Sequence, residues 1–304
     1  MLRVVRIATL VLLAVIVSRG LAPQSSQPSQ AVPSFAEDGS SRAADLRPGM
    51  DFTENGLTLR VPPRGESVAA EAIDGKGKAV ELALETQDDG SVIVHRGEQA
   101  ERVAIVGGTS GACGDGAYTL AGTRWASTYK FYVSSSNLPS NLSFSGAEAA
   151  FKKAVFNIVN AYNDCGRGDA VAASATYVGK TSSSPEISDR AACQSRDGRN
   201  ELGFKRLPSN YLAYSCRWWG GGYYVEGDTA YNTYYKWYSS KPSSCSWRWS
   251  ITNVATHELG HTFGLSHVSE SSHPKLTMSP TIYPCTNSDA TLGLGDLRGL
   301  ESLY

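Results

Sequence analysis

The residues best placed for chemistry in this sequence lie between His257 and His267. The stretch reads HELGHTFGLSH, which fills the pattern H-E-x-x-H-x-x-G-x-x-H and uses three of the five histidines in the chain. On a helix, His257 and His261 would point from one face toward the same ion, while Glu258 would reach a water on that ion. Gly264 can adopt a positive φ without steric cost, so the helix can end there and the chain can turn to bring His267 back.

Three imidazoles with an open fourth position are the ligand set of a catalytic zinc ion, because structural zinc sites are closed by four protein ligands. Zinc lowers the pKa of a bound water, and Glu258 is placed to accept the proton as hydroxide attacks a scissile carbonyl. Two other interpretations are a helix with two core histidines and a zinc site without turnover. The complete motif argues against the first, and the intact Glu258 argues against the second. The sequence therefore predicts Zn²⁺ held by His257, His261 and His267, with Glu258 as general base.

The elements that must hold these residues can be read along the chain. A helix is expected from about Ser250 to Gly264, and apolar residues at helical spacing predict two more. These two helices lie at residues 145–163 and about 295–303. Short strands are expected near residues 124–133, 202–204, 211–214 and 223–231.

The chain before residue 112 divides into three parts. Basic residues followed by a short apolar run predict a signal peptide over residues 1–22, with an uncleaved anchor as the alternative. Residues 23–50 are rich in Ser, Pro and Gln, which predicts a disordered linker. Alternating apolar residues and a turn at Asp88-Asp89-Gly90 predict a β-rich segment over residues 51–111, either a propeptide or an accessory segment. Residues 112–304 would then form the zinc-containing domain.

Composition narrows the class of partner. Of the 304 residues 41% are hydrophobic and 19% charged, an ordinary globular mixture, and the net charge is −1. This balance gives no reason to expect a nucleic acid or an anionic membrane as a partner. We expect a secreted, extracellular monomer that acts on protein or peptide substrates and has no membrane attachment after signal removal.

The six cysteines all lie at or after residue 113. An even number of cysteines in a secreted chain predicts three disulfides, and none of them has the C-x-x-C spacing of a cysteine zinc site. Sequence alone does not choose among the possible pairings. We favour the pairs Cys113–Cys165, Cys193–Cys216 and Cys245–Cys285.

The zinc motif, followed by the run Leu276-Thr277-Met278-Ser279-Pro280, resembles the metzincin metallopeptidases. The Met-x-Pro run and the chain end from Leu294 are most similar to the matrixin branch, and secreted bacterial matrixin-like peptidases are the nearest likeness. The resemblance covers about residues 113–304. It implies an α+β, metzincin-like catalytic domain with a twisted mixed sheet, an active-site helix and a C-terminal helix, preceded here by a small β-rich N-terminal segment. It also implies structural Ca²⁺ and a role for Met278 in a tight turn beneath the zinc, where it packs instead of ligating.

Latency is a further implication of the resemblance, because matrixin precursors are zymogens whose zinc is held by a cysteine before the mature enzyme. Cys113 lies at about that place, but the Pro-Arg that precedes such a cysteine is absent. A switch at Cys113 would also leave an odd number of cysteines, so we favour a disulfide there. A propeptide before residue 112 would then inhibit in another way, or not at all.

Substrate contacts and function are less sharply indicated. Tyr224, Glu226 and Tyr283 are candidates for the substrate cleft. The aromatic stretch over residues 218–249 fits a strand-rich core better than an aromatic-lined cleft. We predict a secreted zinc endopeptidase. The alternatives are a secreted zinc-containing binding module for protein or cell-wall glycan without turnover, and zinc hydrolysis of a non-peptide bond.

Overall fold

The computed structural model describes residues 40–96 and 111–304, and all of these fall within one compact unit, residues 31–304. We call residues 40–96 the N-terminal segment and, after the expectation from the resemblance, residues 111–304 the catalytic part. The predicted signal peptide, residues 1–22, and residues 23–39 of the predicted linker lie outside the described residues. Within the described ranges, no helix combines the length and apolar character needed to cross a membrane.

The N-terminal segment is built of strands. They are β1 (Ser40–Ala43), β2 (Asp51–Glu54), β3 (Leu57–Arg60), β4 (Glu66–Asp74), β5 (Ala79–Thr86) and β6 (Val92–Arg96). The predicted hairpin turn at 88–90 joins β5 to β6, with Gly90 at a φ of 86°. Residues 40–50 belong to the expected disordered linker, yet β1 pairs with β6, which offers it a free sheet edge.

The catalytic part alternates strands with helices. Its strands are β7 (Thr119–Leu120), β8 (Tyr129–Ser134), β9 (Ala175–Thr181), β10 (Ala192–Cys193), β11 (Asn200–Lys205), β12 (Tyr211–Gly220), β13 (Tyr223–Asn232), β14 (Lys236–Tyr238), β15 (Arg248–Ser250) and β16 (Leu265–Ser266). Its helices are α1 (Gly111–Gly114), α2 (Phe144–Val159), α3 (Ile251–Thr262), the 3-10 turn η1 (Ser288–Ala290) and α4 (Leu294–Leu303). The mixed sheet, the motif helix and the C-terminal helix agree with the α+β class expected from the resemblance.

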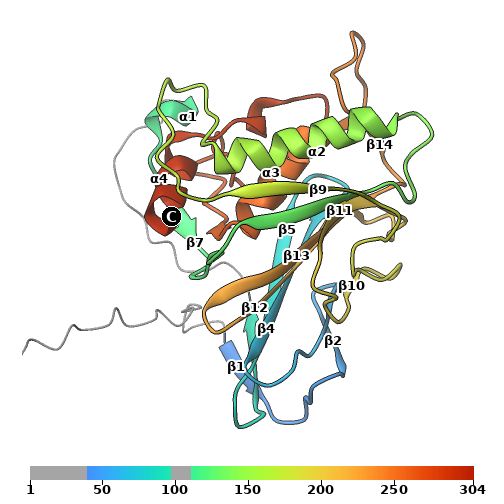
Figure 1. The fold of residues 1–304 in the computed structure, drawn as a ribbon, viewed down its shortest axis with the longest axis vertical. Coiled ribbons are helices and arrows are strands. Elements are labelled where there is room, and N and C mark those ends of the chain that lie inside the picture. Colours follow the sequence, from blue (N-terminus) through green and yellow to red (C-terminus); the bar gives the residue numbers. More distant parts are fainter. Residues whose placement is uncertain (1–39, 97–110) are drawn as a thin grey trace, which may run out of the picture. The chain divides into compact units, whose positions relative to one another are not determined.

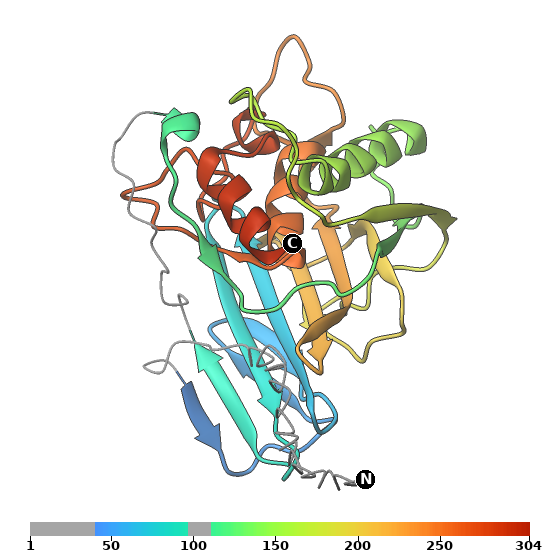
Figure 2. The ribbon, with the colours of Figure 1, turned by 60° about the vertical axis from the view of Figure 1, so that its left-hand side comes forward.

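One sheet joins the two parts. Its nine described strands run in the order β1-β6-β5-β4-β12-β13-β11-β8-β9. Strands β9, β8, β11 and β13 are parallel, whereas β12 is antiparallel to β13 and β4 is antiparallel to β12. Figure 2 shows the blue-to-cyan strands of the N-terminal segment beside the orange strands of the catalytic part. The pairing of β4 with β12 is therefore the seam between them.

Two apolar clusters fill the opposite faces of this sheet. Helices α2 and α3 lie side by side over one face (Figure 1), where Phe151 and Leu259 join the larger cluster. On the other face Leu57 and Leu59 of β3 pack with Trp218. Because side chains alternate along a strand, successive residues of β4 enter different clusters.

Local sequence explains the two long helices. The hydroxyl of Ser143 accepts a hydrogen bond from the backbone N–H of Gly146 at 3.1 Å and caps α2, and Ser250 caps α3 in the same way through Asn253 at 3.3 Å. All residues of α3 are buried, although many of them are polar. Each buried polar group then needs a partner, which Asn253 finds in Asp289 at 3.0 Å.

Three disulfides cross-link residues within the catalytic part. They join Cys113 to Cys165, Cys193 to Cys216, and Cys245 to Cys285, the pairing that the sequence analysis favours. Cys113 is therefore not available as a zinc ligand. No cysteine precedes residue 113, so no disulfide ties the N-terminal segment to the catalytic part.

Candidate metal centre

The three histidines of the motif converge on one point. Their Nε2 atoms are 3.3 Å apart for His257 and His261, 3.2 Å for His257 and His267, and 3.1 Å for His261 and His267. The first two project from α3, and the third returns after the turn at Gly264. That glycine has a φ of 96°, and a Cβ there would overlap the backbone oxygen of Thr123. A residue with a side chain at 264 would thus disturb the return of His267.

Backbone hydrogen bonds fix the orientation of two of these rings. His257 donates from Nδ1 to the carbonyl oxygen of Thr277 at 2.7 Å, and His261 donates from Nδ1 to Leu265 at 2.9 Å. With Nδ1 as the donor, each of these two rings can turn an Nε2 lone pair inward, and burial lowers the pKa of His261 to about 3. Zinc–nitrogen bonds of about 2.0–2.1 Å in a tetrahedron give nitrogen–nitrogen distances of about 3.3–3.4 Å. The observed separations fit a zinc ion closely.

Glu258 lies beside this point and is fully buried. The hydroxyl of Ser215, on β12, donates to its Oε2 atom, while no group among the described residues hydrogen-bonds to Oε1. Burial, with a smaller contribution from the neighbouring Glu71 carboxylate, raises the pKa of Glu258 to about 8. A buried carboxylate with one fixed and one free oxygen is suited to exchange a proton with a molecule held at the metal.

A fourth side chain completes the cluster, and it comes from β4. The Oε2 atom of Glu71 lies 2.7 Å from Nε2 of His261, and its Oε1 atom lies 3.1 Å from His267 and 3.4 Å from His257. The residue is fully buried. Burial alone would raise the pKa of Glu71, but its interactions with the three histidines outweigh burial and hold that pKa well below the usual range. In return, Glu71 raises the pKa of His267. Sequence reasoning missed this residue, because nothing near it marks a metal ligand.

Met278 supports the site from beneath. Its side chain is buried, and a Cβ at position 260 would overlap its sulfur atom, so Gly260 allows the close approach. Asp296 of α4 holds the turn that contains Met278. This carboxylate accepts hydrogen bonds from the backbone N–H groups of Thr277 at 2.9 Å, Met278 at 3.2 Å and Gly293 at 2.8 Å. Because Thr277 also accepts from His257, the last helix is coupled to the metal site.

The three residues expected in the substrate cleft have different surroundings. Tyr283 is 55% exposed, and it follows the segment after Met278. Tyr224 is buried in the large apolar cluster, with its hydroxyl 3.4 Å from the carbonyl oxygen of His261. Glu226 accepts from the backbone N–H groups of Asp197 and Gly198. Tyr224 and Glu226 on β13 are thus buried, whereas Tyr283 is exposed, and their assignment to the substrate cleft stays a prediction.

Comparison with known proteins agrees with the geometry. Residues 208–304 match the family model described as matrixin, a stretch that contains β12, β13, α3, the three histidines and α4. No curated protein matches the chain significantly. The match and the site that it contains identify the chain as a zinc metallopeptidase similar to the matrixins.

Proposed function

We propose that the protein is a secreted zinc endopeptidase that hydrolyses peptide bonds of proteins, with Glu258 as general base. The observation that supports this most is the free Oε1 atom of Glu258 beside three converging imidazole nitrogens. His257, His261 and His267 would hold the metal. When bound, zinc polarises a water molecule and stabilises negative charge on the substrate carbonyl.

The chain's own groups divide the remaining work. Ser215 fixes Oε2 of Glu258, which leaves Oε1 to take the proton of the attacking water and to return it to the leaving amine. The Nδ1 hydrogen bonds of His257 and His261 fix ring orientation, since the carbonyl acceptors are backbone groups. Met278 packs under the helix and keeps water away from that side.

Secretion, a precursor form and structural calcium belong to the same proposal. The three disulfides fit an oxidising compartment, and the predicted signal peptide over residues 1–22 would direct the chain there. Glu186, Asp197 and Glu226 offer carboxylate oxygens within 4.8 Å of one another, and we propose this group for Ca²⁺. A rise in melting temperature with Ca²⁺ but not with equal Mg²⁺ would support that assignment. No change with either ion would remove it.

The exposed aromatic residues give the alternative some support. Trp247 is 74% exposed and Tyr234 is 61% exposed, so both could contact a glycan or protein without any turnover. However, Tyr231, Trp237 and Trp249 from the same stretch are buried in the core. Most of the aromatic stretch is therefore structural, which favours the peptidase.

A digest of casein tests the proposal directly. The secreted protein is incubated with casein with and without a zinc chelator, and beside the variant Glu258→Gln. We expect cleavage that is lost with the chelator and in the variant, while the variant still binds one zinc ion. Normal cleavage by Glu258→Gln would exclude Glu258 as the base. If the intact precursor is inactive, the same digest is repeated after limited proteolysis between β6 and α1.

A further inference from the structure

The N-terminal segment pairs with two elements of the catalytic part, and one of its strands reaches the metal site. Strand β4 pairs with β12 along its length, and Glu71 lies opposite Ser215, the residue that holds Glu258. Beyond β4 the chain turns and meets the segment after Met278. There Ile282 donates to the carbonyl oxygen of Gly77 at 2.9 Å, and Ala79 donates to Pro280 at 3.0 Å. The backbone of residues 66–79 thus runs across the site between two pairing partners.

The alternation of β4 aims Glu71 at the histidines. Ala69 and Ile73 lie in the apolar cluster of α3, whereas Ala70 and Ala72 lie in the cluster on the other face. Glu71, between Ala70 and Ala72, must therefore point to the α3 side. Its Oε2 atom lies 2.7 Å from Nε2 of His261, and its Oε1 atom lies 3.1–3.4 Å from Nε2 of the other two histidines. Glu71 and the three histidines thus form a group whose ligand atoms lie close enough together to hold one metal ion.

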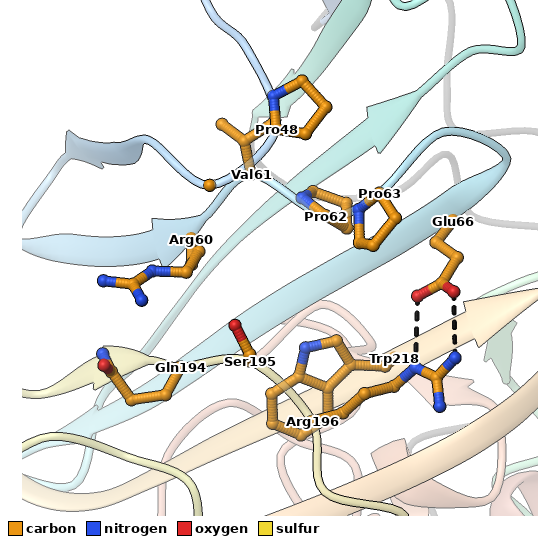
Figure 3. A pocket seen from close by; sticks show the side chains of 11 residues that line it. Pro48, Arg60, Val61, Pro62, Pro63, Glu66, Gln194, Ser195, Arg196 and Trp218 are labelled. Atoms are coloured by element: carbon orange, nitrogen blue, oxygen red, sulfur yellow. Dashed lines mark hydrogen bonds and ion pairs between the residues drawn. The ribbon is translucent and has the colours of Figure 1, made fainter.

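The segment is held firmly but without covalent cross-links. The buried Arg217 of β12 forms an ion pair at 2.5 Å with the partly buried Glu81 of β5, and Tyr214 donates to the carbonyl oxygen of Thr58 at 3.1 Å. At the rim, Glu66 pairs with Arg196 beside a pocket of about 400 Å³ (Figure 3). Since every cysteine lies at or after residue 113, after one cut beyond β6 the segment would be held by non-covalent contacts alone.

We propose that Glu71 is the fourth zinc ligand of the uncleaved chain and that β4 occupies the edge of β12 on which an extended substrate would pair. This inference rests on the proposed peptidase function. The Glu71 carboxylate stands where the attacking water must bind, and β4 already uses the backbone groups that β-strand addition by a peptide would need. The described conformation is thus the latent one. Cleavage after β6 and departure of the segment open both the metal and the strand edge.

A metal-binding experiment tests this without relying on activity. The full chain carries Glu258→Gln to prevent self-cleavage and is loaded with Co²⁺, whose visible spectrum reports its ligands. Adding Glu71→Gln should change the spectrum and speed metal loss to a chelator by about tenfold or more, since even indirect partners of metal ligands contribute this much. The control Glu66→Gln removes a carboxylate from the same strand, away from the histidines, and should match the parent. Equal spectra and equal metal loss for all three chains would refute the assignment.

A second measurement needs no change at Glu71 and so does not depend on the folding of that variant. A simple peptide hydroxamate, which ligates zinc, is titrated into the zinc-loaded Glu258→Gln chain before and after the cut between β6 and α1 and separation of the segment. Binding should be at least about tenfold weaker before the cut. Equal binding in both forms would refute the proposal that the N-terminal segment blocks the metal site.

The two proposals fail separately. If Glu71→Gln alters the cobalt spectrum but no form of the chain cleaves casein, the fourth ligand stands and the peptidase function falls. If the intact, zinc-loaded wild-type chain cleaves casein as fast as the trimmed chain, the peptidase function stands, but the proposal that the N-terminal segment blocks the site is refuted.

Discussion

Replacing Asp296 by asparagine should destabilise the protein and loosen its metal site together. Asp296 is buried, and burial raises its pKa to about 6, so the group is ionised at pH 7. Its Oδ2 atom accepts from Thr277 and Gly293, and its Oδ1 atom accepts from Met278. An asparagine can keep its oxygen toward the first two donors only, which points its NH₂ group at the N–H of Met278.

The size of the effect follows from these contacts. One charge-assisted hydrogen bond is lost, the other two become neutral, and a buried donor is left facing another donor. With about 1.5–3 kcal/mol for a bond to a charged group, the free energy of unfolding should fall by about 2–4 kcal/mol. In a domain of this size that corresponds to a drop of about 5–15 °C in melting temperature.

Thermal unfolding and zinc release provide the assay. The matched control is Asp189→Asn, because the Asp189 side chain is 85% exposed. Asp296→Asn should also release zinc faster, since Thr277 orients His257 through its carbonyl oxygen. If both variants melt at the wild-type temperature and keep zinc equally well, the coupling of α4 to the metal site would be disproved.

Three further predictions concern the site and its surroundings. Gly260→Ala should push Met278 from its place, lower the free energy of unfolding by about 1–3 kcal/mol and weaken zinc binding, as calorimetry and a chelator titration would show. Ser215→Ala removes the donor to Glu258 and should lower kcat of the trimmed enzyme by about tenfold or more with little change in zinc content; an unchanged kcat would mean that Ser215 does not position the base. Burial raises the pKa of Glu226 from 4.5 to about 7, so the folded state favours the protonated form of this group. The contribution of Glu226 to the stability of the folded state is therefore complete below about pH 4.5 and is lost as pH rises through 7. In calcium-free buffer the free energy of unfolding should therefore fall by about 1–3 kcal/mol between those values, and Glu226→Gln should flatten the profile.

The part of the site that the sequence predicts is the part that local geometry determines. His257 and His261 converge because of helical spacing, and Gly264 ends the helix because only glycine takes its φ of 96° easily. The helix boundaries near Ser250 and Leu294 follow from capping and periodicity in the same way. The disulfide pairing was a choice among several, and the structure agrees with it.

Glu71 could not be found because its role depends on a distant partner. Strand β4 reads ESVAAEAID, a run rich in alanine and glutamate that favours helix over strand. It is extended because β12 offers an edge, and tertiary pairing overrides local propensity. The same pairing with β4 accompanies the extension of β12 to Gly220, beyond the expected 211–214. A strand pattern gives alternation, but it does not reveal which other strand lies beside it.

The seam between β4 and β12 also has a consequence for how the protein folds. Tyr214, Cys216 and Trp218 are buried, and they lie in the cluster that β3, β4 and β5 complete. Without the N-terminal segment, nascent catalytic chains would expose these side chains beside an unpaired strand edge, a surface prone to aggregate. We therefore expect the segment to assist the folding of residues 111–304. The full chain should refold from denaturant in much higher yield than residues 111–304 alone, and supplying residues 40–96 as a separate peptide should restore part of that yield.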